Sequence, residues 1–288
     1  MEFYVFCCAK VCVGKWQEPF VSKLEMFLKE TGPMSLREKQ LSDLLGPMFR
    51  VSWLQETEST NTDVKRELLA GEQAGILVCL ADRQTKGKGT RGRVWESEQK
   101  ALLVSIGLTL TEPIPSLMPV LGWDVMQCCR QVDSRVRVKW PNDLWIEGKK
   151  LGGILCEVVH LKSGQTGLVI GIGINLKGTN KERAYLSLRS DGYVDFFADV
   201  IRTAARCVKT FTPEKIKQIG SRWSRFDALY GTKVFAQMPN GRIISGTEQG
   251  INEKGELILS CGTKRLAFSD ITLHLHTRDG KSSDGFIG

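Results

Sequence analysis

A basic, glycine-rich loop between two apolar runs constrains this chain more than any other segment. The two runs, residues 75–81 and 101–110, have the composition of strands and can pair across the loop. The loop itself, residues 84–95, interleaves Lys and Arg with glycines and ends on Trp95. Glycine lets a backbone approach a ligand closely, and backbone N–H groups together with cations can surround phosphate or carboxylate oxygens. The segment therefore predicts an anion-binding loop held by a sheet, with a solvated basic turn as the alternative.

The segments on either side of this loop predict an α/β (α+β) fold with a mixed, largely antiparallel sheet. A polar run at residues 58–63 is rich in capping residues and starts a helix that can end at Gly71. A turn at Ser163-Gly164 joins two apolar runs into an antiparallel pair. Apolar alternation and periodicity indicate further strands at 49–54 and 135–139 and helices at 117–130, 195–208 and 213–223.

We expect four segments along the chain. Residues 1–50 form a short helical extension, with helices over 21–28 and 36–45 that end at Gly-Pro pairs. Residues 51–228 form the α/β domain. Residues 229–276 read as short strands separated by Asn-Gly and Lys-Gly turns, which is typical of a small β-barrel. Residues 277–288 form a polar tail.

Composition and charge restrict the class of protein. With 42% hydrophobic and 25% charged residues the composition is that of a globular protein. The apolar runs are all shorter than the roughly 20 residues of a membrane-spanning helix. Nine cysteines without a Cys-x-x-Cys pair favour reduced thiols in an intracellular protein. A net charge of +8 favours an acidic partner, and the gathering of cations in a few loops favours a small anionic ligand over nucleic acid.

Five motifs follow one another along the chain. They are Ser59-Thr60-Asn61, the loop at 84–95, Lys139-Trp140-Pro141-Asn142-Asp143, Gly148-Lys149-Lys150-Leu151-Gly152-Gly153-Ile154-Leu155 and Gly171-Ile172-Gly173-Ile174-Asn175. Each motif alone is a weak signal, but their order and spacing resemble the biotin protein ligase family. The resemblance covers roughly residues 51–270 and implies a class II synthetase-like catalytic domain followed by an SH3-like C-terminal barrel.

Members of this family carry out a two-step reaction, which the resemblance implies for this chain. The biotin carboxylate attacks the α-phosphate of ATP, with Mg²⁺ on the phosphates, and pyrophosphate leaves. A lysine amine of a biotin carboxyl carrier domain then attacks the resulting biotinyl-5′-AMP. An acyl adenylate is already activated, so positioning and charge stabilisation should suffice without an enzyme nucleophile.

The resemblance assigns most of the candidate residues to biotin. Ser59, Thr60 and Asn61 are neutral and suit the uncharged ureido head of biotin, while helix capping is the alternative role of the first two. Lys150 is expected to reach the biotin carboxylate and the α-phosphate. The set implied for biotin is Ser59, Thr60, Asn61, Gln84, Gly87, Lys88, Gly89, Thr90, Lys150, Gly153 and Gly171. For its last two glycines, ordinary packing is the alternative.

A second, overlapping set is implied for ATP. Lys139 and Arg93 are expected to neutralise phosphate charge and, with Lys150, form the implied catalytic set. Asn142 and Asp143 supply oxygens that suit Mg²⁺. The set implied for ATP is Lys88, Arg93, Trp95, Lys139, Asn142, Asp143, Lys150 and Asn175. Trp95 is expected to cover the intermediate, with a plain core position as its alternative.

Two departures from the family pattern qualify these expectations. Many members carry Gly-Arg-Gly-Arg where this chain has Gly87-Lys88-Gly89-Thr90. Lysine cannot copy the planar, bidentate recognition of arginine, and threonine carries no charge, so we expect a leakier adenylate. Some relatives have an N-terminal DNA-binding domain, whereas residues 1–50 leave no room for a recognition helix. We therefore expect no operator binding.

Other readings remain open at this point. A lipoate or octanoate protein ligase or transferase shares the catalytic fold, and a nucleic-acid-binding protein would suit the pI near 9.0. The basic loop before Trp95 and the Lys-Trp-Pro-Asn-Asp run favour biotin. We expect a cytoplasmic protein, with organelle targeting and homodimer formation left open.

Overall fold

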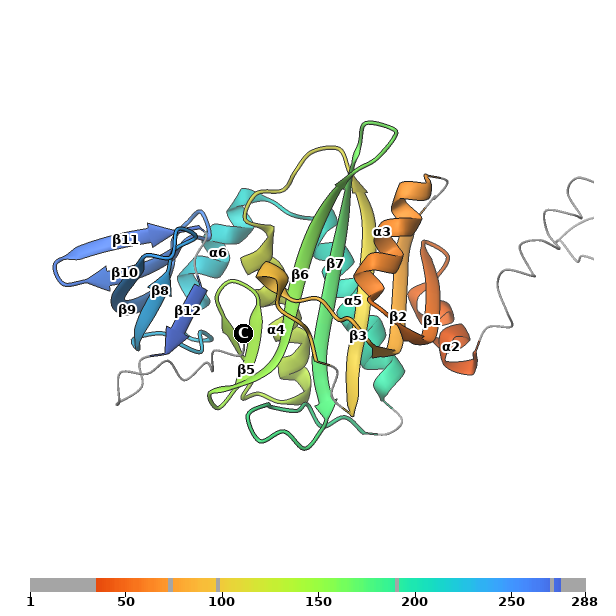
Figure 1. Ribbon diagram of the computed structural model, residues 1–288, viewed down its shortest axis with the longest axis horizontal. Helices are drawn as coiled ribbons and strands as arrows, with labels where there is room; N and C mark the ends of the chain where they lie inside the picture. Colours follow the sequence, from red (N-terminus) through yellow and green to blue (C-terminus); the bar gives the residue numbers. More distant parts are fainter. Residues whose placement is uncertain (1–34, 72–74, 97–98, 190–191, 270–271, 276–288) are drawn as a thin grey trace, which may run out of the picture.

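Two sheets and a set of flanking helices form the molecule (Figure 1). A computed structural model describes residues 35–71, 75–96, 99–189, 192–269 and, through their backbone, 272–275. The larger sheet has seven strands in the order β1-β2-β3-β7-β6-β5-β4, and the smaller has five in the order β11-β10-β9-β8-β12. The expected helix over 21–28 lies outside the described residues.

The seven-stranded sheet is mixed and largely antiparallel, as the sequence predicts. Its strands are β1 (Phe49–Thr57), β2 (Ile76–Gln84), β3 (Lys100–Leu110), β4 (Arg137–Lys139), β5 (Asp143–Ile146), β6 (Lys149–His160) and β7 (Thr166–Lys177). β1 pairs with β2 in parallel, and the other neighbouring pairs are antiparallel. The two expected hairpins are confirmed: β2 pairs with β3 across the basic loop, and β6 pairs with β7.

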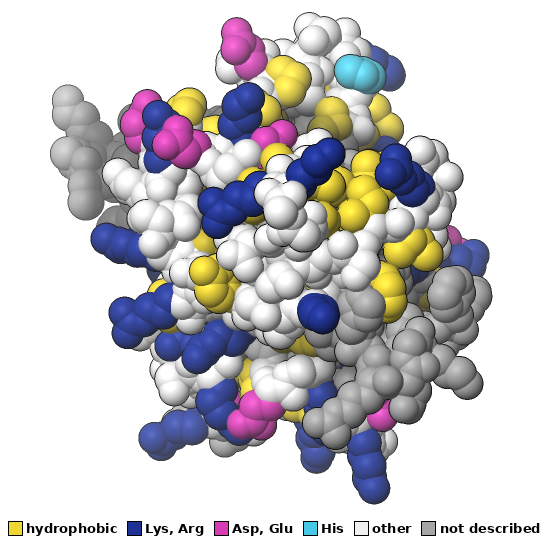
Figure 2. Space-filling view, turned by 90° about the vertical axis from the view of Figure 1, so that its left-hand side faces the viewer, with side chains coloured by type: hydrophobic (Ala, Val, Ile, Leu, Met, Phe, Trp, Pro, Cys, Tyr) yellow, Lys and Arg dark blue, Asp and Glu magenta, His cyan; other side chains and the backbone are white. Residues whose placement is uncertain are grey.

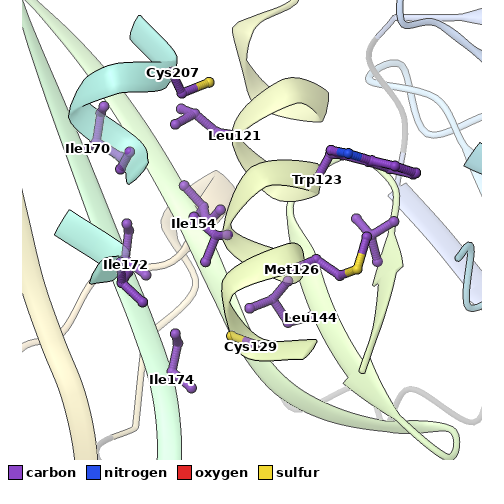
Figure 3. Packing of buried hydrophobic residues seen from close by; sticks show 14 of the residues in the cluster. Leu121, Trp123, Met126, Cys129, Leu144, Ile154, Ile170, Ile172, Ile174 and Cys207 are labelled. Carbon is purple, nitrogen blue, oxygen red and sulfur yellow. The ribbon is translucent and has the colours of Figure 1, made fainter. Parts of the chain in front are cut away.

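Helices cover both faces of this sheet. They are α2 (Leu36–Leu45), α3 (Thr60–Ala70), α4 (Leu117–Val132), α5 (Tyr193–Lys209) and α6 (Pro213–Trp223). In α5 the apolar residues recur at helical spacing and are buried, which explains why this helix packs on the sheet. Figure 3 shows α4 and α5 facing the isoleucines of β6 and β7 in the main core. A smaller cluster lies under α3 on the opposite face.

The side chains of β3 point alternately to the two faces of the large sheet and give these faces different surroundings. Leu102, Val104 and Ile106 belong to the core under α4 and α5, because successive side chains of a strand point to opposite faces. The other face carries Ser105 and Gly107 toward α3. A Cβ at Gly107 would lie 2.6 Å from a methyl of Val64, so glycine lets α3 lie close to the sheet. This close approach positions the start of α3 over the strands.

The smaller sheet lies at one end of the large one. It contains β8 (Lys233–Gln237), β9 (Ile243–Ile251), β10 (Leu257–Cys261), β11 (Lys264–Phe268) and β12 (Thr272–Leu275), all paired antiparallel. Two hydrogen bonds tie its β9–β10 turn to the large domain: Trp140 Nε1 donates to Gly255 O at 2.9 Å, and Ser116 Oγ donates to Lys254 O at 2.6 Å. The short strands expected after residue 229 are confirmed, while the description of them as a barrel stays a prediction.

Two buried carboxyl groups meet where the sheets join. Asp227 precedes the small sheet and accepts hydrogen bonds from Trp223 Nε1 and Leu229 N, while Glu248 on β9 accepts from Gly250 N. Burial raises the pKa of Asp227 to about 6. Burial and the neighbouring Asp227 charge raise the pKa of Glu248 to about 9. The fold therefore favours a protonated carboxyl group at this junction.

Further properties of the described residues concern membrane-spanning helices, cysteine pairs and groups of metal-binding side chains. Within these ranges no helix is both long and apolar enough to cross a bilayer. The described cysteines are all free, and burial raises the pKa values of Cys79 and Cys156 to about 12. No group of three or more His, Cys, Asp and Glu side chains gathers in the described part of the chain. Cys128 and Cys129 lie in α4, where the sequence places them.

Candidate functional site

A cavity lies where the start of α3, the basic loop and the strands β3, β6 and β7 meet. Thirteen of the residues expected at a binding site line it: Ser59, Thr60, Asn61, Gln84, Lys88, Gly89, Thr90, Trp95, Asn142, Asp143, Lys150, Gly153 and Gly171. Four others, Gly87, Arg93, Lys139 and Asn175, do not. The structure therefore brings together motifs that are far apart in the sequence.

Neutral polar side chains form one end of the cavity. Thr60 donates its backbone N–H to Gln84 Oε1 at 2.8 Å, and its hydroxyl lies 2.7 Å from the hydroxyl of Ser105. Ser105 Oγ donates to Asn61 Oδ1 at 2.5 Å. Ser59 is at the N-cap position of α3 but makes no side-chain capping bond, so the structure does not support the capping role. This end suits an uncharged ligand group with its own donors and acceptors.

Glycines on β7 make room for this polar end. A Cβ at Gly171 would collide with Asn61 Oδ1, and a Cβ at Gly173 would lie 2.5 Å from the Trp95 ring. Both positions therefore bring a side chain from another element against the backbone of β7. At Gly171 the absence of a side chain therefore serves both the packing of Asn61 and the shape of the cavity. The sequence alone does not decide between these two reasons for a glycine.

The opposite part of the cavity is charged. Lys150 Nζ lies 2.7 Å from Asp143 Oδ1 and 5.9 Å from the centre of the Trp95 ring. Gly153 faces this pair, since a Cβ there would lie 3.4 Å from Lys150 Nζ. The side chains of Lys150 and Asp143 are 27% and 18% exposed, so their charges are partly shielded from water. This arrangement can hold a carboxylate or phosphate beside a lysine ammonium group.

The Lys-Trp-Pro-Asn-Asp run shapes the cavity wall, and not all of its residues face the cavity. Lys139 is buried, with its Nζ 4.4 Å from the centre of the Trp145 ring. The Trp140–Pro141 peptide bond is cis, and Asn142 Nδ2 donates to Ile154 O at 2.6 Å. Asn142 and Asp143 consequently line the cavity while Lys139 lies outside its lining.

Asn175 supports the backbone beneath Lys150. Asn175 is 1% exposed, and its side-chain Nδ2 donates to Lys150 O at 3.5 Å. Its backbone carbonyl oxygen accepts from Leu186 N. Ala184 N also donates to Lys150 O, at 2.9 Å. Asn175 therefore fixes the strand that carries Lys150 and does not itself line the cavity.

The basic loop is folded back on itself. Gly89 N donates to Arg93 O at 2.7 Å, and Trp95 N donates to Gly87 O at 2.9 Å. Arg93 Nη2 donates to Thr90 Oγ1 at 2.8 Å, and Arg93 lines an outer groove of the loop with Gly87. Thr90 lines the cavity instead, and Lys88 lines both the cavity and the groove. The expectation that Arg93 meets phosphate thus requires the loop to rearrange.

Sequence reasoning missed two residues that build the polar end, Ser105 and Glu157. Ser105 is fully buried, and Asn61 Nδ2 donates to Glu157 Oε2 at 2.8 Å. A signal existed for Ser105, because it is the one hydroxyl within the apolar run 101–108. Glu157 carries a comparable signal as a carboxylate within the apolar run 151–159. Buried polar side chains in strands usually have a specific partner.

Comparison with known proteins places this site in a family. The model of the biotin/lipoate A/B protein ligase family matches residues 53–175. The bifunctional ligase/repressor BirA of Escherichia coli (strain K12) is 30% identical over 223 residues, which span 73% of this chain and 68% of that protein. The biotin--[acetyl-CoA-carboxylase] ligase of Mycobacterium tuberculosis is 25% identical over 261 residues, or 81% of this chain and 93% of that protein.

A solved structure shows the same fold. The biotin protein ligase from Aquifex aeolicus in complex with biotin and ATP has a TM-score of 0.63 and 24% identity, over 78% of this chain and 99% of that one. The fold, the order of the five motifs and the similarity to BirA all agree. The chain belongs to the biotin/lipoate A/B protein ligase family, among its biotin protein ligases.

Proposed function

We propose that this protein is an ATP-dependent biotin protein ligase of the biotin-[acetyl-CoA-carboxylase] ligase type. A biotin carboxylate oxygen attacks the α-phosphorus of ATP, and pyrophosphate leaves. A lysine amine of a biotin carboxyl carrier domain then attacks the acyl carbon of biotinyl-5′-AMP, an amide bond forms, and AMP leaves with its electron pair. The amine nitrogen loses its extra proton to solvent.

One observation carries this proposal: the cavity has a neutral polar end and a charged end. The neutral end offers side chains such as Thr60 and Asn61, which match the ureido group of biotin in charge and hydrogen-bonding capacity. The charged end offers Lys150 and Lys88, which match a carboxylate or phosphate. A ligand with an uncharged head and an anionic tail fits both ends at once.

Lys150 is the residue that we place at the reacting atoms. Its ammonium group can lie beside both the carboxylate and the α-phosphate, whose negative charges otherwise repel each other. Charge placed in advance where it is needed stabilises a transition state without reorganisation. Asp143 holds Lys150 at 2.7 Å and thereby keeps its side chain extended over Gly153. Lys139 and Arg93 remain proposed phosphate contacts.

Trp95 is proposed to close the cavity over the intermediate. Its ring lies against Gly173, and its Nε1 has no hydrogen-bond acceptor among the described residues. A buried donor without a partner costs free energy, which an acceptor on a ligand would recover. This supports a covering role for Trp95 over a plain core position.

Mg²⁺ would accompany the phosphates of ATP. One Asp143 oxygen is paired with Lys150, which leaves its second oxygen, and Asn142 directs its Nδ2 at Ile154 O and hence its Oδ1 away from that carbonyl. One carboxylate, one amide oxygen and phosphate oxygens suit the way Mg²⁺ is usually held with nucleotides. When bound there, Mg²⁺ would neutralise phosphate charge. We therefore propose that Asn142 and Asp143 contribute its protein ligands.

The remaining assignments concern the protein's surroundings. We propose residues 51–228 as the catalytic domain, residues 229–276 as an SH3-like barrel, a cytoplasmic location, and an acidic carrier domain as the acceptor. Figure 2 shows Lys and Arg side chains spread over the face at the small-sheet end, which supports an acidic partner.

We keep the expectation of no operator binding, and a specific, biotin-dependent shift of duplex DNA would contradict it. Sedimentation with and without biotin tests for a homodimer.

The test is transfer of labelled biotin to a carrier domain in the presence of ATP and Mg²⁺. Lys150→Met should lower the rate at least ~100-fold, since removing one preorganised charge-stabilising group typically has this effect. Lys149→Met is the matched control, because Lys149 is the adjacent, exposed lysine of β6, and should retain the wild-type rate. No transfer by the wild-type protein overturns the proposal. Transfer of lipoate to a lipoyl domain in preference to biotin would replace it.

A further inference from the structure

Glu157 lies on β6 behind the neutral end of the cavity. Its Oε2 accepts Asn61 Nδ2 at 2.8 Å, and Lys65 Nζ lies 3.6 Å from its Oε1. Asn61 lines the cavity, whereas Glu157 lines the outer groove of the basic loop. The Asn61 amide therefore connects Glu157 by a hydrogen bond to the lining of the cavity.

The carboxylate decides which way this amide faces. An ionised carboxylate can only accept hydrogen bonds, so the NH₂ group of Asn61 must face Glu157 and its oxygen must face Ser105. Asn61 Oδ1 also lies against Gly171, where an alanine methyl would collide with it. The amide is 4% exposed, so water does not offer it alternative partners.

The orientation of the Asn61 amide determines which of the neighbouring hydroxyl groups, those of Ser105 and Thr60, donate and which accept. Ser105 has a single hydroxyl proton, which it donates to Asn61 Oδ1 at 2.5 Å. The single hydroxyl proton of Thr60 is then donated either to Ser105 Oγ, 2.7 Å away, or to Gln84 Oε1, 3.1 Å away. The hydroxyl of Thr60 consequently has no proton left for the cavity and presents an oxygen lone pair to it.

We propose that Glu157 is a positioning residue for the ureido head of biotin, because it fixes the direction of the Asn61–Ser105–Thr60 hydrogen bonds. This inference rests on the proposed function. A ureido group carries two N–H donors, and the Thr60 hydroxyl oxygen is oriented to accept from one of them. Thr60 N–H holds Gln84 Oε1 at 2.8 Å, which fixes the orientation of a second amide in the same wall.

A glutamine at position 157 has nearly the size of glutamate but would no longer fix the direction of these hydrogen bonds. Its amide can donate as well as accept, so Asn61 could turn over and offer NH₂ to Ser105. Ser105 would then donate to Thr60 and occupy one lone pair of its hydroxyl oxygen, while Gln84 Oε1, 3.1 Å away, would accept the Thr60 proton. The Thr60 oxygen would then have less capacity to accept from a ureido N–H, and a buried hydrogen bond to the ligand would be weakened.

The experiment measures biotin binding without ATP, by calorimetry, in three proteins. Glu157→Gln should weaken biotin ~10-fold, as expected for the loss of one buried hydrogen bond. Lys65→Met is the matched control, because it removes the 3.6 Å ion pair and leaves the Asn61–Glu157 bond in place. It should bind biotin as the wild type does. Desthiobiotin, which keeps the ureido group and lacks sulfur, should show the same ~10-fold loss in Glu157→Gln.

Kinetics separate positioning from a general structural role. In Glu157→Gln the KM for biotin should rise, while kcat at saturating biotin, the KM for ATP and the melting temperature stay at wild-type values. Unchanged biotin affinity in Glu157→Gln overturns the inference. An equal loss of biotin affinity in Lys65→Met also overturns it, as does a loss of affinity in Glu157→Gln that is accompanied by a lower melting temperature. A wild-type protein that does not bind biotin would instead refute the proposed function, and this inference with it.

Discussion

The guanidinium group of Arg93 donates to the hydroxyl of Thr90 at 2.8 Å, across the turn of the basic loop. Arg93 also donates from Nε to Thr90 O, so the two residues brace a turn whose backbone at Arg91 has a φ of +59°. Thr90 faces the cavity, and Arg93 is on the outer side. The position that carries arginine in many relatives is thus occupied here by an acceptor for a neighbouring arginine.

Thr90→Arg should therefore slow the escape of the intermediate. An arginine facing the cavity would add a planar, charged donor pair for the adenylate phosphate, worth about 1.5–3 kcal/mol for a charged hydrogen bond. We expect free biotinyl-AMP to be released ~10-fold more slowly in the absence of acceptor. Quench-flow with chromatographic detection of free biotinyl-AMP measures the rate of this release. Thr90→Val, which removes the hydroxyl without adding charge, is the control, and equal release from all three proteins would refute the leakier adenylate.

Asp143→Asn should impair the use of ATP more than the binding of biotin. The substitution keeps an oxygen for Lys150 at the 2.7 Å contact but removes the carboxylate charge proposed to face Mg²⁺. We expect kcat/KM for ATP to fall ~10-fold or more and the dissociation constant of biotin to stay within ~2-fold. Steady-state rates of pyrophosphate release over a range of Mg²⁺ concentrations give the comparison. A variant whose ATP parameters match the wild type would contradict a metal role for Asp143.

Gly171→Ala should abolish tight biotin binding while the protein remains folded. The new methyl would collide with Asn61 Oδ1, which Ser105 holds at 2.5 Å, so the polar end of the cavity must shift. Overpacking of this kind costs about 1–3 kcal/mol of stability. Thermal unfolding with and without biotin tests it: the shift of the melting temperature by biotin should disappear. Gly192→Ala is the control, because the nearest atom to a Cβ there is 3.8 Å away.

Glu248→Gln should remove a pH dependence of stability. The pKa of Glu248 is raised from 4.5 to about 9 in the folded protein, so the folded state binds a proton that the unfolded state releases. The free energy of unfolding should therefore fall as pH rises from about 4.5 to about 9. Asp227, with its pKa raised to about 6, adds to this fall at the acidic end. Denaturant unfolding at pH 5, 7 and 9 should show a shallower fall in the variant, and equal slopes would contradict the protonated pair.

The sequence predicts much of this architecture because its signals are local. Hairpins such as β6–β7 follow from a glycine turn between alternating runs, and α5 follows from helical periodicity. The contact between β3 and β7 joins residues 100–110 with 166–177, and no local pattern specifies such a pairing. The same limit applies to Glu157, whose partner Asn61 lies 96 residues away. The outward direction of Arg93 depends on one loop conformation, which residue types alone leave undetermined.

The hydrogen bond from Trp140 to Gly255 joins the small sheet to the segment that forms part of the cavity wall. Trp140 lies two and three residues before Asn142 and Asp143, which line the cavity. Asn142 is in turn anchored to β6 through its bond to Ile154 O. The turn at Gly255 and the cavity wall beside Lys150 therefore belong to one continuous set of contacts that spans both sheets.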